Sequence, residues 1–207
     1  MAKTRNVAIL IFDDVEVLDF CGPFEVFSVS GQRSGAGPFN VYTVAQHSPV
    51  LARNRLEVIP HYLLNNCPTP DILVIPGGGG HHSDGTPFGS RKEMQNIKLL
   101  DWIRTTVATA EHVLCVCTGA LILAKTGLSN NLDATTHHGA FNVLRETDPS
   151  LRVMEDQRIV DNGQILFSGG ISAGIDAAFH LIEKLQGKAC ADETARYMEY
   201  HRTTESN

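Results

Sequence analysis

The chain has 207 residues, of which 43% are hydrophobic and 19% are charged, and its formal net charge is -6. A chain of this length suits one large domain, and its apolar fraction is sufficient for a sizeable core. The acidic balance, without any block of lysines or arginines, argues against nucleic acid as a partner and favours a small-molecule substrate.

The cysteines and the apolar segments indicate where the protein is found. There are five cysteines and no CxxC pair, which favours reduced thiols over a disulfide framework. The apolar run Val7–Phe12 ends at two aspartates and is too short for an export signal. No segment is long and uncharged enough to cross a bilayer. We therefore expect a cytoplasmic protein that does not enter membranes.

The first half of the chain alternates between strand-like and helix-like segments. The run Asn6–Phe12 is continuously apolar, which is typical of a strand covered on both faces. A helix is expected over Gly22–Val29, with Pro23 at its first position, and the alternating segment Phe39–Ala45 predicts a strand. The sequence DILVIPGGGG, residues 71–80, predicts a buried strand that ends in a glycine loop.

The second half continues this alternation. A long amphipathic helix is expected over Arg91–Thr109. The strand HVLCV follows, and then a helix over Thr118–Thr126 that Gly127 closes in the usual C-terminal position. Asn162-Gly163 between two apolar segments predicts a β-hairpin. Three more helices are expected: one ending near Glu146, one within GGISAGIDAAFHLIEKL, and one over Asp192–Tyr200.

Strands and helices that alternate along a chain predict an α/β fold. We expect a three-layer sandwich with a mostly parallel, flavodoxin-like central sheet. No repeat or linker divides residues 1–207, so we expect a single domain. In such a sheet the parallel strands end at one common edge, where loops carry ligand sites.

The segment His112–Gly127, HVLCVCTGALILAKTG, has the order of a nucleophile elbow. A buried strand ends at Cys117, and a helix begins at once behind Thr118 and Gly119, which would hold the thiol above the sheet edge. Nearby backbone N–H groups and the helix dipole predict a pKa of Cys117 lowered toward a thiolate. The alternative is a buried structural cysteine, which we prefer for Cys115 because its side chain points to the opposite face.

The glycine loop Gly77–Gly80 ends another buried strand, so we expect it at the same sheet edge as Cys117. Its backbone N–H groups would then form an oxyanion hole. A flexible turn and a phosphate loop are the alternatives, but no GxxxxGK[ST] pattern follows, and no cofactor is predicted.

Histidines are frequent, so metal binding has to be considered. His81-His82 and His137-His138 are adjacent pairs, whose side chains point apart on a regular element. No HExxH motif is present and no Cys/His spacing suits zinc. We therefore expect no metal site.

Several segments together resemble a known family. NVAILIFDDVEVLDFCGPFEVF, VIPGGGG, CVCTGALILAKTGL, ATTHH and GGISAGIDAAFHLIEKL resemble, in order and spacing, the ThiJ/PfpI superfamily, which is related to the class I glutamine amidotransferase fold. The resemblance runs nearly end to end and is greatest to the isocyanide hydratase branch. It implies a nucleophile at Cys117, a carboxylate partner at Asp19 and a supporting residue at Thr118. It also implies oxyanion-hole backbone at Gly78, Gly79 and Thr118, and a homodimer with sites near the interface.

Departures from the superfamily pattern limit the reactions that this sequence is expected to catalyse. Superfamily proteases carry a histidine directly after the nucleophile, where this sequence has Thr118. The general base that peptidase and amidase activities require is therefore missing, which argues against both. The histidine of the deglycase-like branch falls on His137, which keeps glyoxalase or deglycase chemistry on reactive aldehydes as an alternative.

A non-enzymatic function is the second alternative. The same fold forms the ligand-binding part of regulators similar to the arabinose-response family, which carry a helix-turn-helix pair. This sequence shows neither that pair nor a basic tail, so we expect an enzyme. A redox or ligand sensor that uses an oxidisable Cys117 is the remaining non-catalytic interpretation.

The resemblance gives Asp19 a chemical role. It follows a strand and precedes Gly22-Pro23, which places it in a loop at the carboxyl edge of the sheet, and without the resemblance a helix-capping role would be the default. Beside a thiolate, Asp19 should share one proton and have a raised pKa. We therefore expect covalent hydration of small electrophiles, in which Cys117 adds to the terminal carbon of an organic isocyanide. Asp19 then protonates the adduct, Thr118 and the glycine amides hold it, and water releases an N-substituted formamide.

Overall fold

The computed structural model describes residues 3–31, 35 and 37–202. Its central sheet has seven strands in the order β12-β13-β9-β6-β1-β2-β5. All neighbouring pairs are parallel except β12 with β13, which confirms the predicted α/β fold with a mostly parallel sheet. The strands are β1 (Arg5–Leu10), β2 (Phe39–Ala45), β5 (Tyr62–Leu63), β6 (Ile72–Ile75), β9 (His112–Val116), β12 (Ile159–Asp161) and β13 (Ile165–Ser168).

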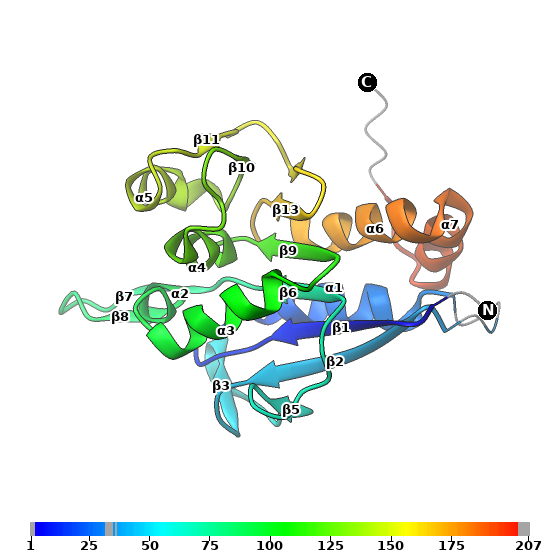
Figure 1. Cartoon of the computed structure of the whole chain (residues 1–207), viewed down its shortest axis with the longest axis horizontal. Helices are drawn as coiled ribbons and strands as arrows, with labels where there is room; N and C mark the ends of the chain where they lie inside the picture. The colour runs from blue at the N-terminus through cyan, green and yellow to red at the C-terminus, as the bar shows by residue number, and fades with distance from the viewer. Residues whose placement is uncertain (1–2, 32–34, 36, 203–207) are drawn as a thin grey trace.

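Helices cover both faces of this sheet (Figure 1). On one face α1 packs against α6 and α7, and on the other α4 contacts α2, α3 and α5. The helices are α1 (Val17–Val29), α2 (Ser90–Glu93), α3 (Ile97–Val107), α4 (Gly119–Thr126), α5 (Phe141–Thr147), α6 (Ala173–Gln186) and α7 (Lys188–Tyr197), with short 3-10 helices η1 (Arg53–Arg55) and η2 (His138–Ala140). Across the described residues, none of these helices has the length and apolar character needed to span a membrane.

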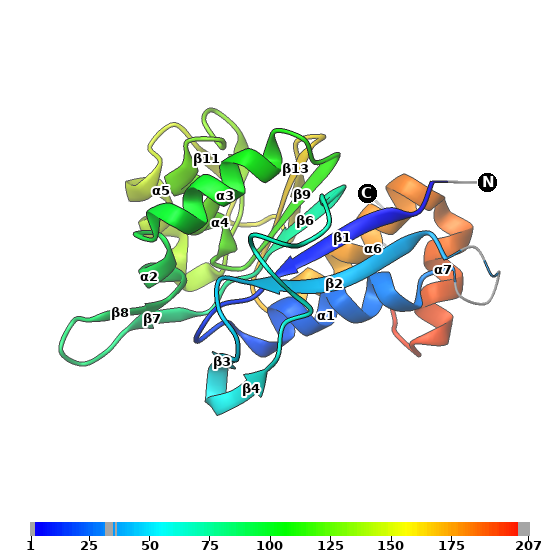
Figure 2. The same cartoon turned by 60° about the horizontal axis from the view of Figure 1, so that its bottom comes forward.

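Three small two-stranded sheets lie outside the central one. They are antiparallel β3 (Val50–Ala52) with β4 (Leu56–Val58), antiparallel β7 (Gly79–His81) with β8 (Pro87–Gly89), and parallel β10 (Asp133–Ala134) with β11 (Arg152–Val153). Their strands have two or three residues, which is too short for a periodic pattern in the sequence. The β7–β8 hairpin projects away from the main body (Figure 2).

The middle strands of the sheet are buried on both faces. Residues Val7–Leu10 of β1, Ile72–Ile75 of β6 and Val113–Val116 of β9 are all 0% exposed. Helices on both faces leave no solvent-facing side, which explains why these strands are continuously apolar instead of alternating. The carboxyl ends of β6 and β9 therefore lie next to each other at one edge of a rigid core.

Two predicted helices differ from the observed ones. α1 begins at Val17 instead of Gly22, and Pro23 lies inside it, where it removes one backbone hydrogen bond. The expected helix over Arg91–Thr109 is split into α2 and α3, because the Asn96 side chain caps α3 by accepting from the Leu99 amide at 3.2 Å.

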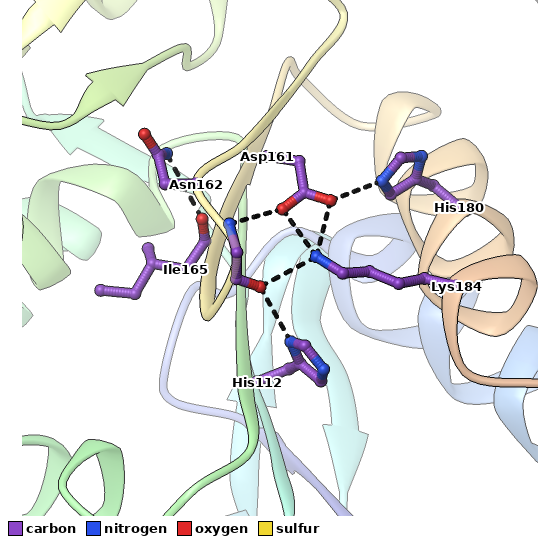
Figure 3. A network of polar contacts seen from close by, with 7 residues as sticks. His112, Asp161, Asn162, Ile165, His180 and Lys184 are labelled. Carbon is purple, nitrogen blue, oxygen red and sulfur yellow. Dashed lines mark hydrogen bonds and ion pairs between the residues drawn. The ribbon is translucent and has the colours of Figure 1, made fainter.

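The predicted hairpin at Asn162-Gly163 is confirmed, and an ionic network attaches it to α6 (Figure 3). Asp161 accepts from Lys184 Nζ at 2.9 Å and contacts His180 Nε2 at 2.8 Å. Lys184 Nζ also donates to the Gly163 carbonyl at 3.0 Å. The antiparallel pair β12–β13 of the central sheet is thus held against a helix of the covering layer.

Candidate active site

Cys117 occupies a sharp turn between β9 and α4. Its φ is 56°, in the left-handed region that is costly for a residue with a side chain. Its backbone N–H donates to the carbonyl oxygens of Ser168 (3.2 Å) and Gly169 (3.1 Å), and its own carbonyl accepts from Thr136 Oγ1 at 2.7 Å. These bonds hold the strained turn, and the predicted nucleophile-elbow geometry is present.

Gly119 allows α4 to start so close to the sheet. A Cβ built on Gly119 would lie 2.0 Å from the Ile75 carbonyl oxygen at the end of β6, a separation that real atoms do not tolerate. A residue with a side chain would push α4 away from β6 and would move the elbow with it.

Asp19 lies in the first turn of α1, not in a loop as predicted, because the helix starts earlier than Pro23 indicated. Its side chain is 0% exposed. Oδ2 accepts a hydrogen bond from the Gly77 amide at 3.0 Å. Oδ1 is buried without a hydrogen-bond partner among the described residues, although the Cys117 thiol and the Ile171 backbone are close enough to influence the carboxyl. An unpartnered buried carboxylate oxygen is costly, and protonation lowers that cost because it removes the buried charge.

The ionisation of the pair differs in part from the prediction. Burial raises the pKa of Asp19 to about 7, with the Gly77 hydrogen bond and the neighbouring Cys117 thiol acting in the opposite direction. Burial and the neighbouring Asp19 charge raise the pKa of Cys117 to about 12, against the lowering effect of the Thr118 and Ile171 amides. The expected resting thiolate is therefore wrong for this structure, since desolvation and like-charge repulsion exceed the attraction of the helix start. The pair therefore passes from no net charge to one negative charge, carried by Asp19, as the pH rises through about 7.

The glycine loop meets the elbow as predicted, but its amides are engaged otherwise. The Gly78 amide donates to Thr118 Oγ1 at 2.9 Å, and Gly79 pairs with Gly89 in the β7–β8 ladder. Thr118 Oγ1 also accepts from Ser90 Oγ at 3.0 Å. The Gly78 amide thus fixes the Thr118 side chain instead of facing the sulfur. The amides that act on the Cys117 sulfur are those of Thr118 and Ile171.

His137 lies beside the loop that carries Ile171. Its Nδ1 accepts from the Gly139 amide at 3.1 Å, and a Cβ on Gly170 would lie 2.4 Å from its ring. Burial, the adjacent His138 and the charge of Arg91 lower the pKa of His137, which favours the neutral ring. A cavity of about 570 Å³ borders it, with Gly170 and Ile171 in its lining.

Three residues that act on the site were not predicted from the sequence. Ile171 has φ 54°, unusual for a β-branched residue, and its backbone lowers the pKa of both Asp19 and Cys117. Ser90 bonds to Thr118, and Arg91 lies within electrostatic range of Cys117. The glycines of GGISAG indicated a turn around Ile171. Ser90 and Arg91 belong to no motif, so nothing in the sequence pointed to them.

Within the part of the chain that the structure describes, no group of three or more His, Cys, Asp or Glu side chains is arranged to hold a metal ion. All five cysteines are free thiols.

Comparisons with known proteins agree with this architecture. Residues 5–184 match the model of the DJ-1/PfpI family. The chain is 32% identical over 196 residues to an isonitrile hydratase from Pseudomonas putida, covering 94% of this chain and 78% of that protein. It is 21% identical to the HTH-type transcriptional regulator GbdR of Pseudomonas aeruginosa, of which it spans about half, 51%.

Solved structures show the same fold. A ThiJ/PfpI family protein from Pseudomonas syringae superposes with a TM-score of 0.82 at 23% identity, over 100% of this chain and 79% of that chain. DJ-1beta of Drosophila melanogaster superposes with a TM-score of 0.77 at 19% identity, over 97% and 100% respectively. With a family match over most of its length and a relative above 30% identity, the chain belongs to the DJ-1/PfpI family.

Proposed function

We propose that this protein is a cysteine-dependent hydratase that converts an organic isocyanide to an N-substituted formamide. The observation that carries the proposal is the buried pair of Asp19 and Cys117, a carboxyl with one unpartnered oxygen beside a thiol held at a strained elbow. The 32% identity to an isonitrile hydratase supports the choice of substrate.

The first chemical step is addition of the thiol to the terminal carbon of the isocyanide. Asp19 is ionised above about pH 7 and takes the thiol proton as the sulfur attacks, because a free thiolate is disfavoured by the same burial. The sulfur–carbon bond forms, and Asp19 returns the proton to that carbon, which gives a thioimidate. The Thr118 and Ile171 amides, which act on the sulfur, hold it during attack.

The second step is hydrolysis of the thioimidate. Water adds to the carbon, one of its protons passes through Asp19 to the nitrogen, and the carbon–sulfur bond breaks to release the formamide. The thiol recovers the remaining proton. The sum of the steps is isocyanide plus water to formamide, with no oxidant or cofactor.

The proposal is tested with purified protein and a simple alkyl isocyanide such as cyclohexyl isocyanide. We expect formamide production by wild type and a loss of at least about a thousandfold in kcat for Cys117→Ala, since no covalent route is left. Cys21→Ala, on the exposed face of α1, is the matched control and should retain activity. Methylglyoxal is assayed in parallel.

Two results would contradict the proposal: full activity of Cys117→Ala, or turnover of methylglyoxal without turnover of any isocyanide. The second result would assign the site to aldehyde chemistry instead.

A further inference from the structure

Arg91 is a half-buried cation near the site that has no acidic partner among the described residues. It is the second residue of α2, directly after the β7–β8 hairpin. Over residues 3–31, 35 and 37–202, its side chain makes one hydrogen bond, from Nη1 to Ser90 Oγ at 3.1 Å, and no ion pair. Other arginines of the chain, such as Arg158 and Arg202, bind carboxylates. Arg91 is therefore a charge without a counterion.

Short contacts connect Arg91 to the nucleophile. Ser90 Oγ, which accepts from Arg91, donates to Thr118 Oγ1 at 3.0 Å, and Thr118 is the neighbour of Cys117. Burial lowers the pKa of Arg91 and the Cys117 charge opposes that effect, while the Arg91 charge lowers the pKa of His137. The guanidinium is thus within electrostatic range of both the thiol and His137.

Glu16, an acidic group whose charge acts on the site, is already paired. Glu16 lies 3.8 Å from Arg53 Nε, and its charge raises the pKa of Asp19 and of His137. The charge of Glu16 is offset by Arg53, and the charge of Arg91 is not offset. A partly desolvated guanidinium is stabilised by an anion that it can bind with two hydrogen bonds.

We propose that Arg91 binds a carboxylate on the substrate, so that the site selects small acidic electrophiles, with an isocyano acid as the type. The planar guanidinium donates two parallel hydrogen bonds to the carboxylate, a geometry that a lysine cannot reproduce. The substrate's electrophilic carbon is then held near Cys117. The reaction in this inference rests on the proposed function, but recognition of the anion can be tested without turnover.

Alkylation of Cys117 tests the anion site directly. Iodoacetate and iodoacetamide differ in charge but little in shape, and with either reagent the sulfur forms a bond to the CH2 carbon and iodide leaves. The rate of modification at Cys117 is followed by peptide mass spectrometry, and the ratio of the iodoacetate rate to the iodoacetamide rate is compared between variants. We expect Arg91→Gln to lower this ratio by about ten- to a hundredfold. The ratio for Arg91→Lys should lie between that of wild type and that of Arg91→Gln.

The matched control is Lys188→Gln, whose side chain is 65% exposed. It belongs to α7, a helix on the opposite side of the molecule from the β7–β8 hairpin (Figure 1). This substitution removes the same charge and should leave the ratio unchanged. An unchanged ratio in Arg91→Gln would overturn the proposal. An equal fall of both rates would also overturn it, since Arg91 would then act on the thiol and not on the anion. If neither reagent modifies wild-type Cys117, the protonated thiol is unreactive toward alkylation, and the comparison of an acid with its ester as substrates decides the proposal.

Turnover gives the second arm of the test. Isocyanoacetate and its methyl ester are compared as substrates, and Arg91→Gln should lower kcat/KM for the acid by about tenfold or more while changing that for the ester little. If wild type hydrates neither compound while the alkylation ratio responds as expected, the proposed reaction fails and the anion site stands. If the ester is the better substrate of wild type, the anion site fails and the proposed reaction stands.

Discussion

Asp19 and Cys117 show how one buried pair controls protonation. Both pKa values are raised by burial, and the charge of Asp19 further raises that of Cys117. A thiol that stays protonated until substrate arrives is protected from oxidation, since the thiolate is the reactive form. This disfavours a redox sensor and favours proton transfer within the pair during attack.

The pH dependence of activity follows from this pair. Asp19 must be ionised to accept the thiol proton, and its pKa is about 7, so kcat/KM should rise with pH through about 7. Asp19→Asn should lose this rise and about a hundred- to ten-thousandfold in rate, because no general base remains. Stopped assays across pH 5–9 with an alkyl isocyanide provide the measurement. A profile of wild type that is flat through pH 7 would contradict the assignment of Asp19 as the base.

The same residue should make the protein less stable as pH rises. The folded-state pKa of Asp19, about 7, lies above its usual value of 3.8. Between these values the folded chain keeps a proton that the unfolded chain loses, so the free energy of unfolding falls as pH increases. The cost reaches at most about 4 kcal/mol above pH 7, at about 1.4 kcal/mol per pKa unit.

Urea unfolding at pH 4.5 and pH 8 measures this cost. Asp19→Asn should be more stable than wild type at pH 8, with the difference shrinking toward pH 4.5, and Asp156→Asn at an exposed position is the control. If Asp19→Asn is less stable at pH 8, burial of the charge is not what raises the pKa.

At the scale of elements, the site depends on how closely α4 approaches β6. Gly119→Ala would place a Cβ 2.0 Å from the Ile75 carbonyl oxygen, and backbone cannot give way as a side chain can. We expect a loss of at least about 2–3 kcal/mol in stability and a loss of activity, because the elbow moves with the helix. Chemical denaturation and the isocyanide assay measure the two effects.

Gly127 provides the matched substitution at the other end of α4. It has φ 78° and open space around its Cβ position, so Gly127→Ala should cost only about 1 kcal/mol and keep activity. Equal effects of the two substitutions would show that helix conformation, and not the approach to β6, is what Gly119 provides.

At the scale of the whole molecule, the homodimer implied by the resemblance stays a prediction. Association should cover some of the exposed apolar side chains, such as Ile59 (77% exposed) and Ile97 (72% exposed). Sedimentation equilibrium should give twice the 22.6 kDa of the chain. A single species at 22.6 kDa at micromolar concentration would contradict the prediction.

Local patterns in the sequence were sufficient to predict the elbow and the strands of the central sheet except the two-residue β5. β1, β6 and β9 are continuously apolar because both faces are covered, and Asn162-Gly163 specifies its hairpin by backbone conformation alone. The apolar runs and the Asn-Gly turn each lie within a few consecutive residues, so they can be recognised without the rest of the chain. The position of Asp19 relative to Cys117 was reached through the family resemblance and not through any local pattern.

Only the tertiary structure decided the properties of the site. The raised pKa of Cys117 depends on burial by several elements and on Asp19 of a distant helix, and the engagement of the Gly78 amide depends on where Thr118 lies. The proposed role of Arg91 depends on its making no ion pair with a carboxylate among the described residues. The sequence by itself thus determined the longer strands of the central sheet, the elbow and the family. Charge state and recognition depend on distances between groups far apart in the chain, which folding alone brings together.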